Sequence, residues 1–101
     1  MYIKAAKLTF RIDWAQSLKD KRQVRRSLID KTRSKFNASV AEVDAQNTHQ
    51  TLVLGVCMVS CQLSHASRSL DEIVSFMEDV VEQKGLAELV DVCKGVELWD
   101  M

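Results

Sequence analysis

The chain has 101 residues, of which 47% are hydrophobic and 28% are charged, with equal numbers of basic and acidic side chains. This size and composition predict a single soluble globular domain over residues 1–101, and the lack of any run of about 18 apolar residues excludes a membrane-spanning helix. The first residues lack the apolar stretch of a signal peptide, so we expect a cytoplasmic protein.

The first part of the chain predicts a strand and then a helix. Residues 2–12 alternate between apolar and polar side chains, which is typical of a half-buried strand. Ser17, followed three residues later by Asp20, forms a capping-box pattern that predicts a helix over residues 18–36. Asn37 suits the exit of this helix.

The apolar stripe of this helix is thin, because Lys21 and Arg25 interrupt it. Residues 38–44 predict a short second strand, and the polar residues 45–50 have the length of a hairpin connection. Residues 51–60 are apolar at both odd and even positions, which is typical of a strand that is covered on both faces.

The last part of the chain predicts a second helix and a final strand. Ser64 or Ser67 opens the helix, whose apolar residues follow the 3, 4, 7 spacing, and Gly85 is suited to close it. The tail, residues 86–99, predicts a last strand with a kink at Gly95.

The order β-α-β-β-α-β predicts a ferredoxin-like α+β fold, with a four-stranded antiparallel sheet and two helices on one face. The other face then has no helix to cover it, although Val53, Cys57 and Val59 of the third strand point toward it. We expect a second copy of the chain to cover this face, which makes a homodimer. The alternative is an open ligand-binding face.

Two segments resemble the YlxP-like family of small bacterial proteins of unknown function. They are AQSLKDKRQVRRSLIDKTRSKFNASVAEVDAQ (residues 15–46) and LGVCMVS (residues 54–60). The resemblance implies a ferredoxin-like fold and genes that lie among those for translation initiation and ribosome maturation, but it supplies no catalytic residue. Arg25 and Thr32 depart from the family pattern, which usually has larger apolar residues at these positions.

Charge is segregated along the chain. Residues 1–36 hold eleven Lys/Arg and three Asp/Glu, a balance of +8, and residues 37–101 have the opposite balance of −8. On a helical wheel, four cations of the first helix form a ridge opposite its apolar side, with Lys35 nearby; they are Lys19, Arg22, Arg26 and Arg33. Such a ridge is suited to the phosphate backbone of RNA.

Alternatively, the positive charge of the first helix is paired with acidic side chains of the protein itself. The second helix carries five acids that are placed to form ion pairs with the first helix, within one chain or between two: Asp71, Glu72, Glu78, Asp79 and Glu82.

No other group of residues predicts chemistry. Glu42 and Asp44 lie on one face of a strand, with His49 in the following connection, but a metal or acid–base site needs a further ligand, and we interpret them as a polar strand face. The fold is shared by acylphosphatases, yet the loop DWAQ after the first strand lacks the glycine and arginine of a phosphate cradle. Three cysteines without metal-ligand spacing are expected to be small buried residues.

We therefore expect no enzyme, cofactor, metal or small-molecule substrate. The first functional hypothesis is an RNA- or ribosome-associated accessory module that uses the basic ridge. The second is a structural or protein-interaction homodimer whose basic helix pairs with acidic protein surface.

Overall fold

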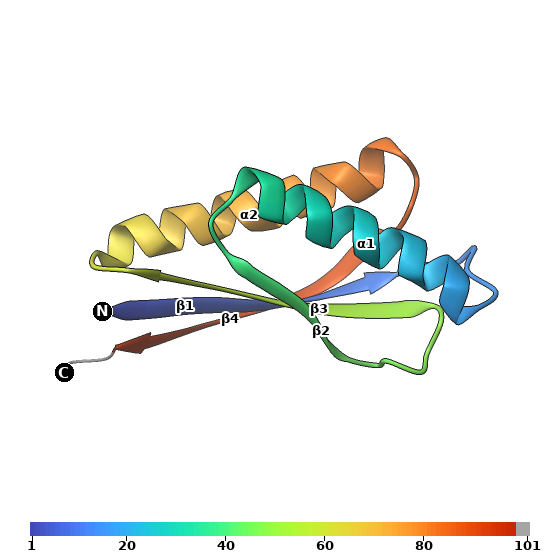
Figure 1. The fold of residues 1–101 in the computed structure, drawn as a ribbon, viewed down its shortest axis with the longest axis horizontal. Helices are drawn as coiled ribbons and strands as arrows, with labels where there is room; N and C mark the ends of the chain where they lie inside the picture. The colour runs from blue at the N-terminus through green and yellow to red at the C-terminus, as the bar shows by residue number, and fades with distance from the viewer. Residues whose placement is uncertain (99–101) are drawn as a thin grey trace.

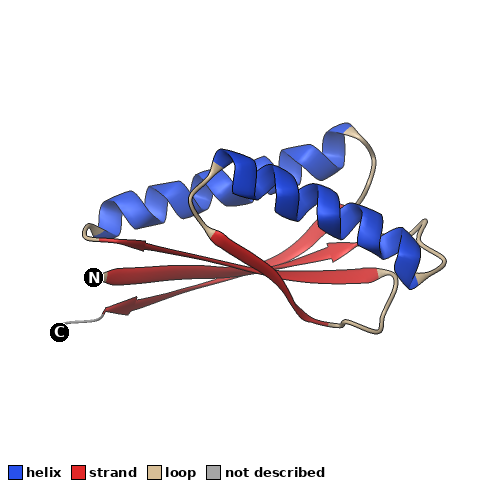
Figure 2. Ribbon diagram, in the orientation of Figure 1, coloured by secondary structure: helices blue, strands red, loops and turns tan. Residues whose placement is uncertain are grey.

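The computed structural model describes residues 1–98, and the six elements follow in the predicted order (Figure 1). They are β1 (Tyr2–Arg11), α1 (Leu18–Lys35), β2 (Ser39–Asp44), β3 (Thr51–Ser60), α2 (Leu63–Gln83) and β4 (Glu88–Leu98). The strands form one antiparallel sheet in the order β2-β3-β1-β4. Both helices lie on the same face of this sheet, as Figure 2 shows, so the predicted ferredoxin-like arrangement is confirmed.

Local signals explain where α1 begins and where α2 ends. The Ser17 hydroxyl accepts a hydrogen bond from the Asp20 N–H at 3.2 Å, as an N-cap residue does. Gly85 follows α2 with a φ of +61°, a left-handed conformation that favours glycine. The start of α2 was predicted at Ser64 or Ser67, but the helix begins at Leu63 after Gln62, which makes no side-chain capping bond.

The core lies between the helices and one face of the sheet. On β1 every second side chain from Ala6 to Phe10 is buried, and Leu54 of β3 lies opposite Leu8. The helices contribute their apolar stripes, and α2 supplies the larger share, with Ala66, Leu70, Ile73, Met77 and Val81 all buried. Within residues 1–98 neither helix has the length and apolar character needed to span a bilayer.

The last strand differs from its predicted course. Its pairing with β1 is regular at Gly95, which lies opposite Ala5, and the register shifts instead between Thr9 and Phe10, near the start of β4. Leu98 is the last described residue of the strand, so the predicted continuation to Trp99 lies outside the described residues.

Candidate nucleic-acid interface

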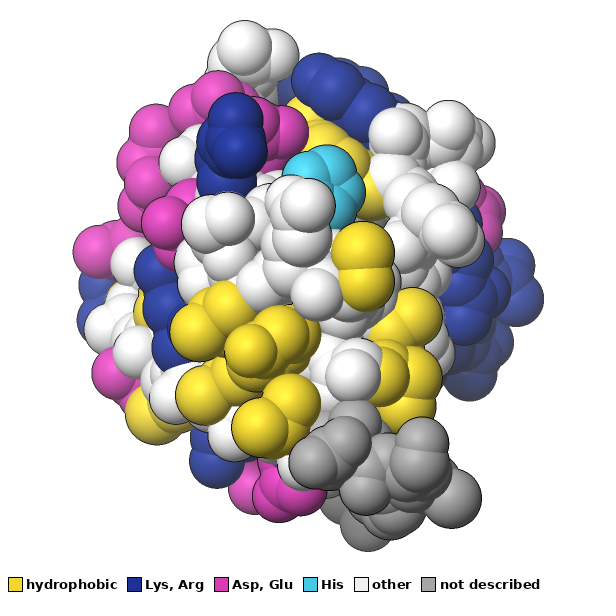
Figure 3. All heavy atoms as spheres, turned by 90° about the vertical axis from the view of Figure 1, so that its left-hand side faces the viewer, with side chains coloured by type: hydrophobic (Ala, Val, Ile, Leu, Met, Phe, Trp, Pro, Cys, Tyr) yellow, Lys and Arg dark blue, Asp and Glu magenta, His cyan; other side chains and the backbone are white. Residues whose placement is uncertain are grey.

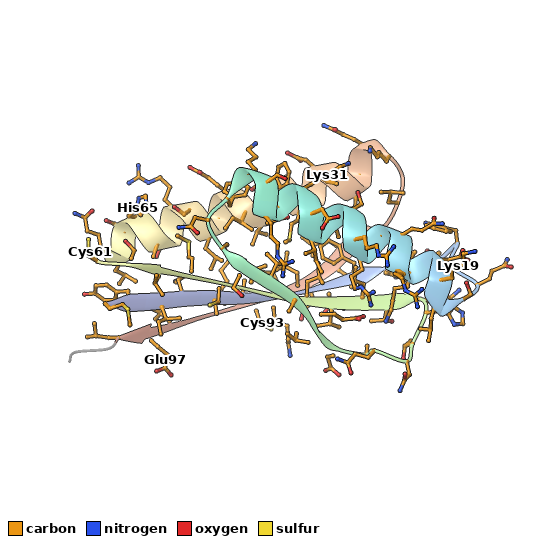
Figure 4. The ribbon with its side chains drawn as sticks, viewed as in Figure 1. Lys19, Lys31, Cys61, His65, Cys93 and Glu97 are labelled. Carbon is orange, nitrogen blue, oxygen red and sulfur yellow. The ribbon has the colours of Figure 1, made fainter. Side chains whose placement is uncertain are left out.

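The basic ridge predicted from the sequence, Lys19, Arg22, Arg26 and Arg33, lies on the outer side of α1. Lys19, Arg22 and Arg26 are exposed, and none of them forms an ion pair or hydrogen bond with any of residues 1–98. Together with Gln23 they border a shallow depression of about 190 Å³. Figure 4 shows Lys19 at the first turn of α1, at one end of the molecule. Three cations are therefore available to an outside polyanion.

The two remaining predicted site residues are exposed but engaged. Nη2 of Arg33 donates a hydrogen bond of 2.8 Å to the carbonyl oxygen of Val40 in β2. Nζ of Lys35 lies 4.7 Å from the ring centroid of Phe76 and 5.7 Å from that of Phe36, at cation–π distance. Arg33 keeps other N–H groups for a ligand, because a guanidinium has five.

Two cations on the inner side of α1 share one carboxylate. Nζ of Lys21 lies 2.8 Å from Oε2 of Glu42, and Nη1 of Arg25 lies 3.0 Å from Oε1 of the same residue. Sequence reasoning placed Lys21 as an interruption of the apolar stripe, yet the residue is only 2% exposed. Arg25 is half-buried and paired, so it does not extend the exposed basic surface. Within residues 1–98, Lys21 and Arg25 are therefore ion-paired, whereas Lys19, Arg22 and Arg26 on the outer side of the helix are not.

The ion pairs of Glu42 also concern the group that it forms in the sequence with Asp44 and His49. Both oxygens of Glu42 face cations, and Asp44 accepts a hydrogen bond from the N–H of Ala45 at 2.7 Å. Ala45 adopts a φ of +53° in the turn that follows β2. Glu42 thus has a cation on each oxygen. The expectation that Glu42 and Asp44 share one face of the strand was wrong, because the register shift pairs Glu42 with Leu54 on the helix side and Asp44 with Val53 on the other side.

The predicted ion pairs between the helices do not form within residues 1–98. Among the five acids of α2 named above, only Asp71 has an ion-pair partner there, and that partner is Lys94 of β4. The hydrogen bond and charge of Lys94 lower the pKa of Asp71, and the nearby charge of Lys4 acts in the same direction. Within residues 1–98, no acid of α2 forms an ion pair with the basic ridge.

Where α1 does meet the end of α2, the two charges are alike. Lys31 of α1 lies beside Lys84, and the hydrogen-bonding contact with Lys84, together with desolvation and charge repulsion, lowers the pKa of Lys31.

Figure 3 views the end of the molecule that lies to the left in Figure 1. In that view most of the visible Asp and Glu side chains gather at the upper left, while a group of Lys and Arg side chains lies on the right.

Trp14 is the aromatic residue in the loop that leads into α1. Its ring is 42% exposed, and Nε1 donates a hydrogen bond of 2.7 Å to the carbonyl oxygen of Leu86. This bond joins the loop before α1 to the turn after α2. The ring is thus held in place while one part of it faces water.

The sheet face without helices carries the residues that we expected to contact a second copy. Val53 is only 6% exposed in the single chain, Cys57 is half-buried, and Val59 is 59% exposed. Most of the apolar area that these three residues offer to a partner therefore belongs to Val59. The expectation that all cysteines are buried was wrong, since Cys61 and Cys93 are exposed.

Comparisons with known proteins agree with the fold and leave the activity open. A family described as "Protein of unknown function (DUF503)" matches residues 3–93. The chain is 31% identical over 68 residues to "Uncharacterized protein YlxP" of Bacillus subtilis (strain 168), which covers 67% of this chain and 74% of that protein.

Two solved structures are similar in fold alone. A de novo designed protein with a ferredoxin fold has a TM-score of 0.59 and 12% identity, over 98% of this chain and 88% of that one. A VAO-type flavoprotein from Myceliophthora thermophila has a TM-score of 0.54 and 15% identity, over 94% of this chain but only 16% of the flavoprotein.

Proposed function

The chain belongs to the DUF503 family of proteins of unknown function, and we propose that it is a non-catalytic cytoplasmic module that binds the phosphate backbone of RNA through the basic ridge. The observation that supports this most is the state of Lys19, Arg22 and Arg26. They are exposed and have no carboxylate partner within residues 1–98, although the chain as a whole has no net charge. A ribosomal RNA is the candidate target, because the YlxP-like resemblance implies genes that neighbour those for ribosome maturation.

The geometry of a straight helix suits a regular row of phosphates. Arg22 and Arg26 are four residues apart, which is about 6 Å along the axis, and the whole ridge extends over about 21 Å at 1.5 Å per residue. Arginine binds phosphate through two parallel N–H groups, and three or four such contacts give a log–log salt slope of about −3. Recognition of this kind reads backbone shape and charge, so we expect little preference for base sequence.

The proposal is tested by reversing the charge of the ridge. The double variant Arg22→Glu/Arg26→Glu should lower the magnitude of the salt slope by about two and abolish retention on an RNA column near physiological salt. The matched control is Arg68→Glu/Lys84→Glu, which changes the net charge equally but lies on and just after α2. Equal RNA binding by the ridge variant and the wild type, or equal losses in the two variants, would refute a specific role of the ridge.

A second candidate function uses the same ridge against protein. Glu72, Asp79 and Glu82 of α2 are exposed and have no ion-pair partner within residues 1–98, so an acidic surface is available on every copy. A homodimer or a complex with another acidic protein would bring the two charged surfaces together. Co-sedimentation with ribosomal subunits at two salt concentrations separates the candidates. Salt-sensitive co-migration supports RNA binding, and dimers that do not bind ribosomes support protein interaction.

A further inference from the structure

Within residues 1–98, the outer edge of β4 has no partner strand. The sheet order places β2 and β4 at its two edges, and β4 pairs only with β1. This strand runs for eleven residues, about 37 Å at 3.4 Å per residue. No side chain of residues 1–98 forms a hydrogen bond with its backbone. A row of backbone N–H and C=O groups therefore faces outward along most of the molecule.

The opposite edge is protected in ways that β4 is not. β2 has only six residues, its register with β3 shifts between Glu42 and Asp44, and Arg33 already occupies the carbonyl of Val40. Short length, irregular pairing and side-chain cover are the devices by which natural proteins prevent strand addition. The single lysine of β4, Lys94, forms an ion pair of 2.6 Å with Asp71 of α2. No proline blocks the edge of β4, because the chain contains none. The pairing of β4 with β1 has one register shift, near the start of β4, and is regular from Asp91 to Leu98.

The side chains of β4 favour contact with another surface. Val90, Val96 and Leu98 are 46%, 51% and 61% exposed, although they are large and apolar. Figure 3 shows hydrophobic side chains gathered on the end of the molecule where β4 ends, and Figure 4 places Cys93 and Glu97 on the side of the sheet away from the helices. A strand added at this edge would cover the valines and satisfy the outward backbone groups at once.

We propose that the occupant of this edge is β4 of a second copy, paired antiparallel about a twofold axis. A self-complementary edge closes after two copies, whereas pairing of β4 with β2 of another copy would continue into a filament and meets a protected strand. The result is a continuous eight-stranded sheet with all four helices on one face. This inference goes beyond the proposed RNA binding, and it names the strand edge instead of the uncovered sheet face.

The dimer leaves the basic ridge free, because α1 packs near β2 and β3, on the other side of the sheet order. Charge also gives the two interactions opposite salt dependence. β4 carries Glu88, Asp91 and Glu97 against Lys94, so two copies repel each other and associate more tightly as salt screens the repulsion. RNA binding by the ridge weakens with salt. Failure of one proposal is therefore distinguishable from failure of the other.

The test compares three lysine substitutions by sedimentation equilibrium in 0.5 M salt. Val96→Lys places a cation from each copy at the paired edge and should raise the dimer dissociation constant about tenfold or more. Val43→Lys on β2 is the matched control, since Val43 is also 51% exposed, and it should leave the constant unchanged. Val59→Lys probes the uncovered sheet face and should also leave it unchanged.

A second measurement uses the unmodified chain. Hydrogen exchange should show that alternate amides of residues 91–97 become more protected as the protein concentration rises, while those of β2 do not. A mass of one chain at all concentrations, together with no such change in exchange, would overturn the proposal. A dimer that Val59→Lys separates and Val96→Lys leaves intact would also overturn it and assign the contact to the sheet face.

Discussion

Nζ of Lys21 in α1 lies 2.8 Å from Oε2 of Glu42 in β2, and the two side chains are only 2% and 10% exposed. The same ammonium donates hydrogen bonds to three backbone carbonyls: those of Ala45 at 2.8 Å and Gln46 at 3.3 Å in the segment after β2, and that of Thr51, the first residue of β3, at 3.3 Å. One lysine therefore fixes the first half of α1 to the β2–β3 connection. Glu42 forms ion pairs with both Lys21 and Arg25, so these three side chains together keep one net positive charge.

Glu42→Ala is expected to destabilise the protein by about 3 kcal/mol, because it leaves the buried ammonium of Lys21 without a counter-charge. Lys21→Met/Glu42→Leu should recover part of this loss, since no buried charge remains. Urea unfolding followed by circular dichroism measures both. Lys19→Met, on the exposed side of the same helix, serves as the control and should change stability by less than about 0.5 kcal/mol. A Glu42→Ala variant as stable as the control would contradict the structural role of the pair.

Thr32→Val is expected to stabilise the protein by about 1 kcal/mol. Thr32 is fully buried in α1, and its hydroxyl has no hydrogen-bond partner within residues 1–98. Valine has nearly the same shape and helix propensity, so the change removes an unsatisfied polar group without opening a cavity. Thermal unfolding should show a higher Tm. Thr48→Val, in the exposed turn after β2, should leave the Tm nearly unchanged, and a lower Tm for Thr32→Val would indicate that the hydroxyl is satisfied in solution.

Gly55→Ala is expected to cost about 1 kcal/mol, because a Cβ at this position would lie 2.8 Å from Cγ1 of Val43. Gly55 pairs with Ala41 in the sheet, and the side chain of the nearby Val43 lies over Gly55 and must turn or shift to make room. The double variant Gly55→Ala/Val43→Ala removes the clash, so its free energy of unfolding should equal that of Val43→Ala alone within about 0.5 kcal/mol. Additive losses in the double-mutant cycle would rule out the steric explanation.

Lys94→Met is expected to raise the pKa of the Asp71 carboxyl toward its ordinary value. The hydrogen bond and charge of Lys94 depress this pKa in the folded protein, so the contact stabilises the fold above the ordinary carboxyl pKa. That contribution is lost as the pH falls through the depressed pKa, and it is small because Asp71 is exposed. NMR titration of the carboxyl carbon gives the pKa directly. Lys84→Met removes the same charge at the far end of α2 and should not affect Asp71.

Local patterns were sufficient to predict the fold. The alternation of β1, the Ser17 cap and the glycine after α2 each depend on residues close together in sequence, and the structure has all three. The start of α2 was missed by one to four residues because Gln62 precedes it without a side-chain capping bond, so no sequence signal marks the position. The bulge near the start of β4 likewise has no glycine to mark it.

The electrostatic partners could not be predicted, because they depend on how distant segments pack. Lys21 was predicted only to interrupt the apolar stripe of the helix. Its partner Glu42 is 21 positions along the chain and comes close because the sheet places Glu42 opposite Leu54, on the helix side. One signal was available: Lys21 lies three residues before Val24 and seven before Leu28, on the same helical face. The exposure of Lys19, Arg22 and Arg26 was predicted correctly from the wheel, but the contact between Arg33 and Val40 required the fold.

Tyr2 lies opposite Leu98. The beginning of β1 and the end of β4 therefore lie at the same end of the molecule, which is 46 Å long. Lys19 lies at the other end (Figure 4). A chain immobilised on a sensor surface through its N-terminus would therefore present the first turns of α1 to the solution and crowd the free edge of β4. The choice of attachment site would then decide whether a binding assay detects ligands of α1 or of the β4 edge.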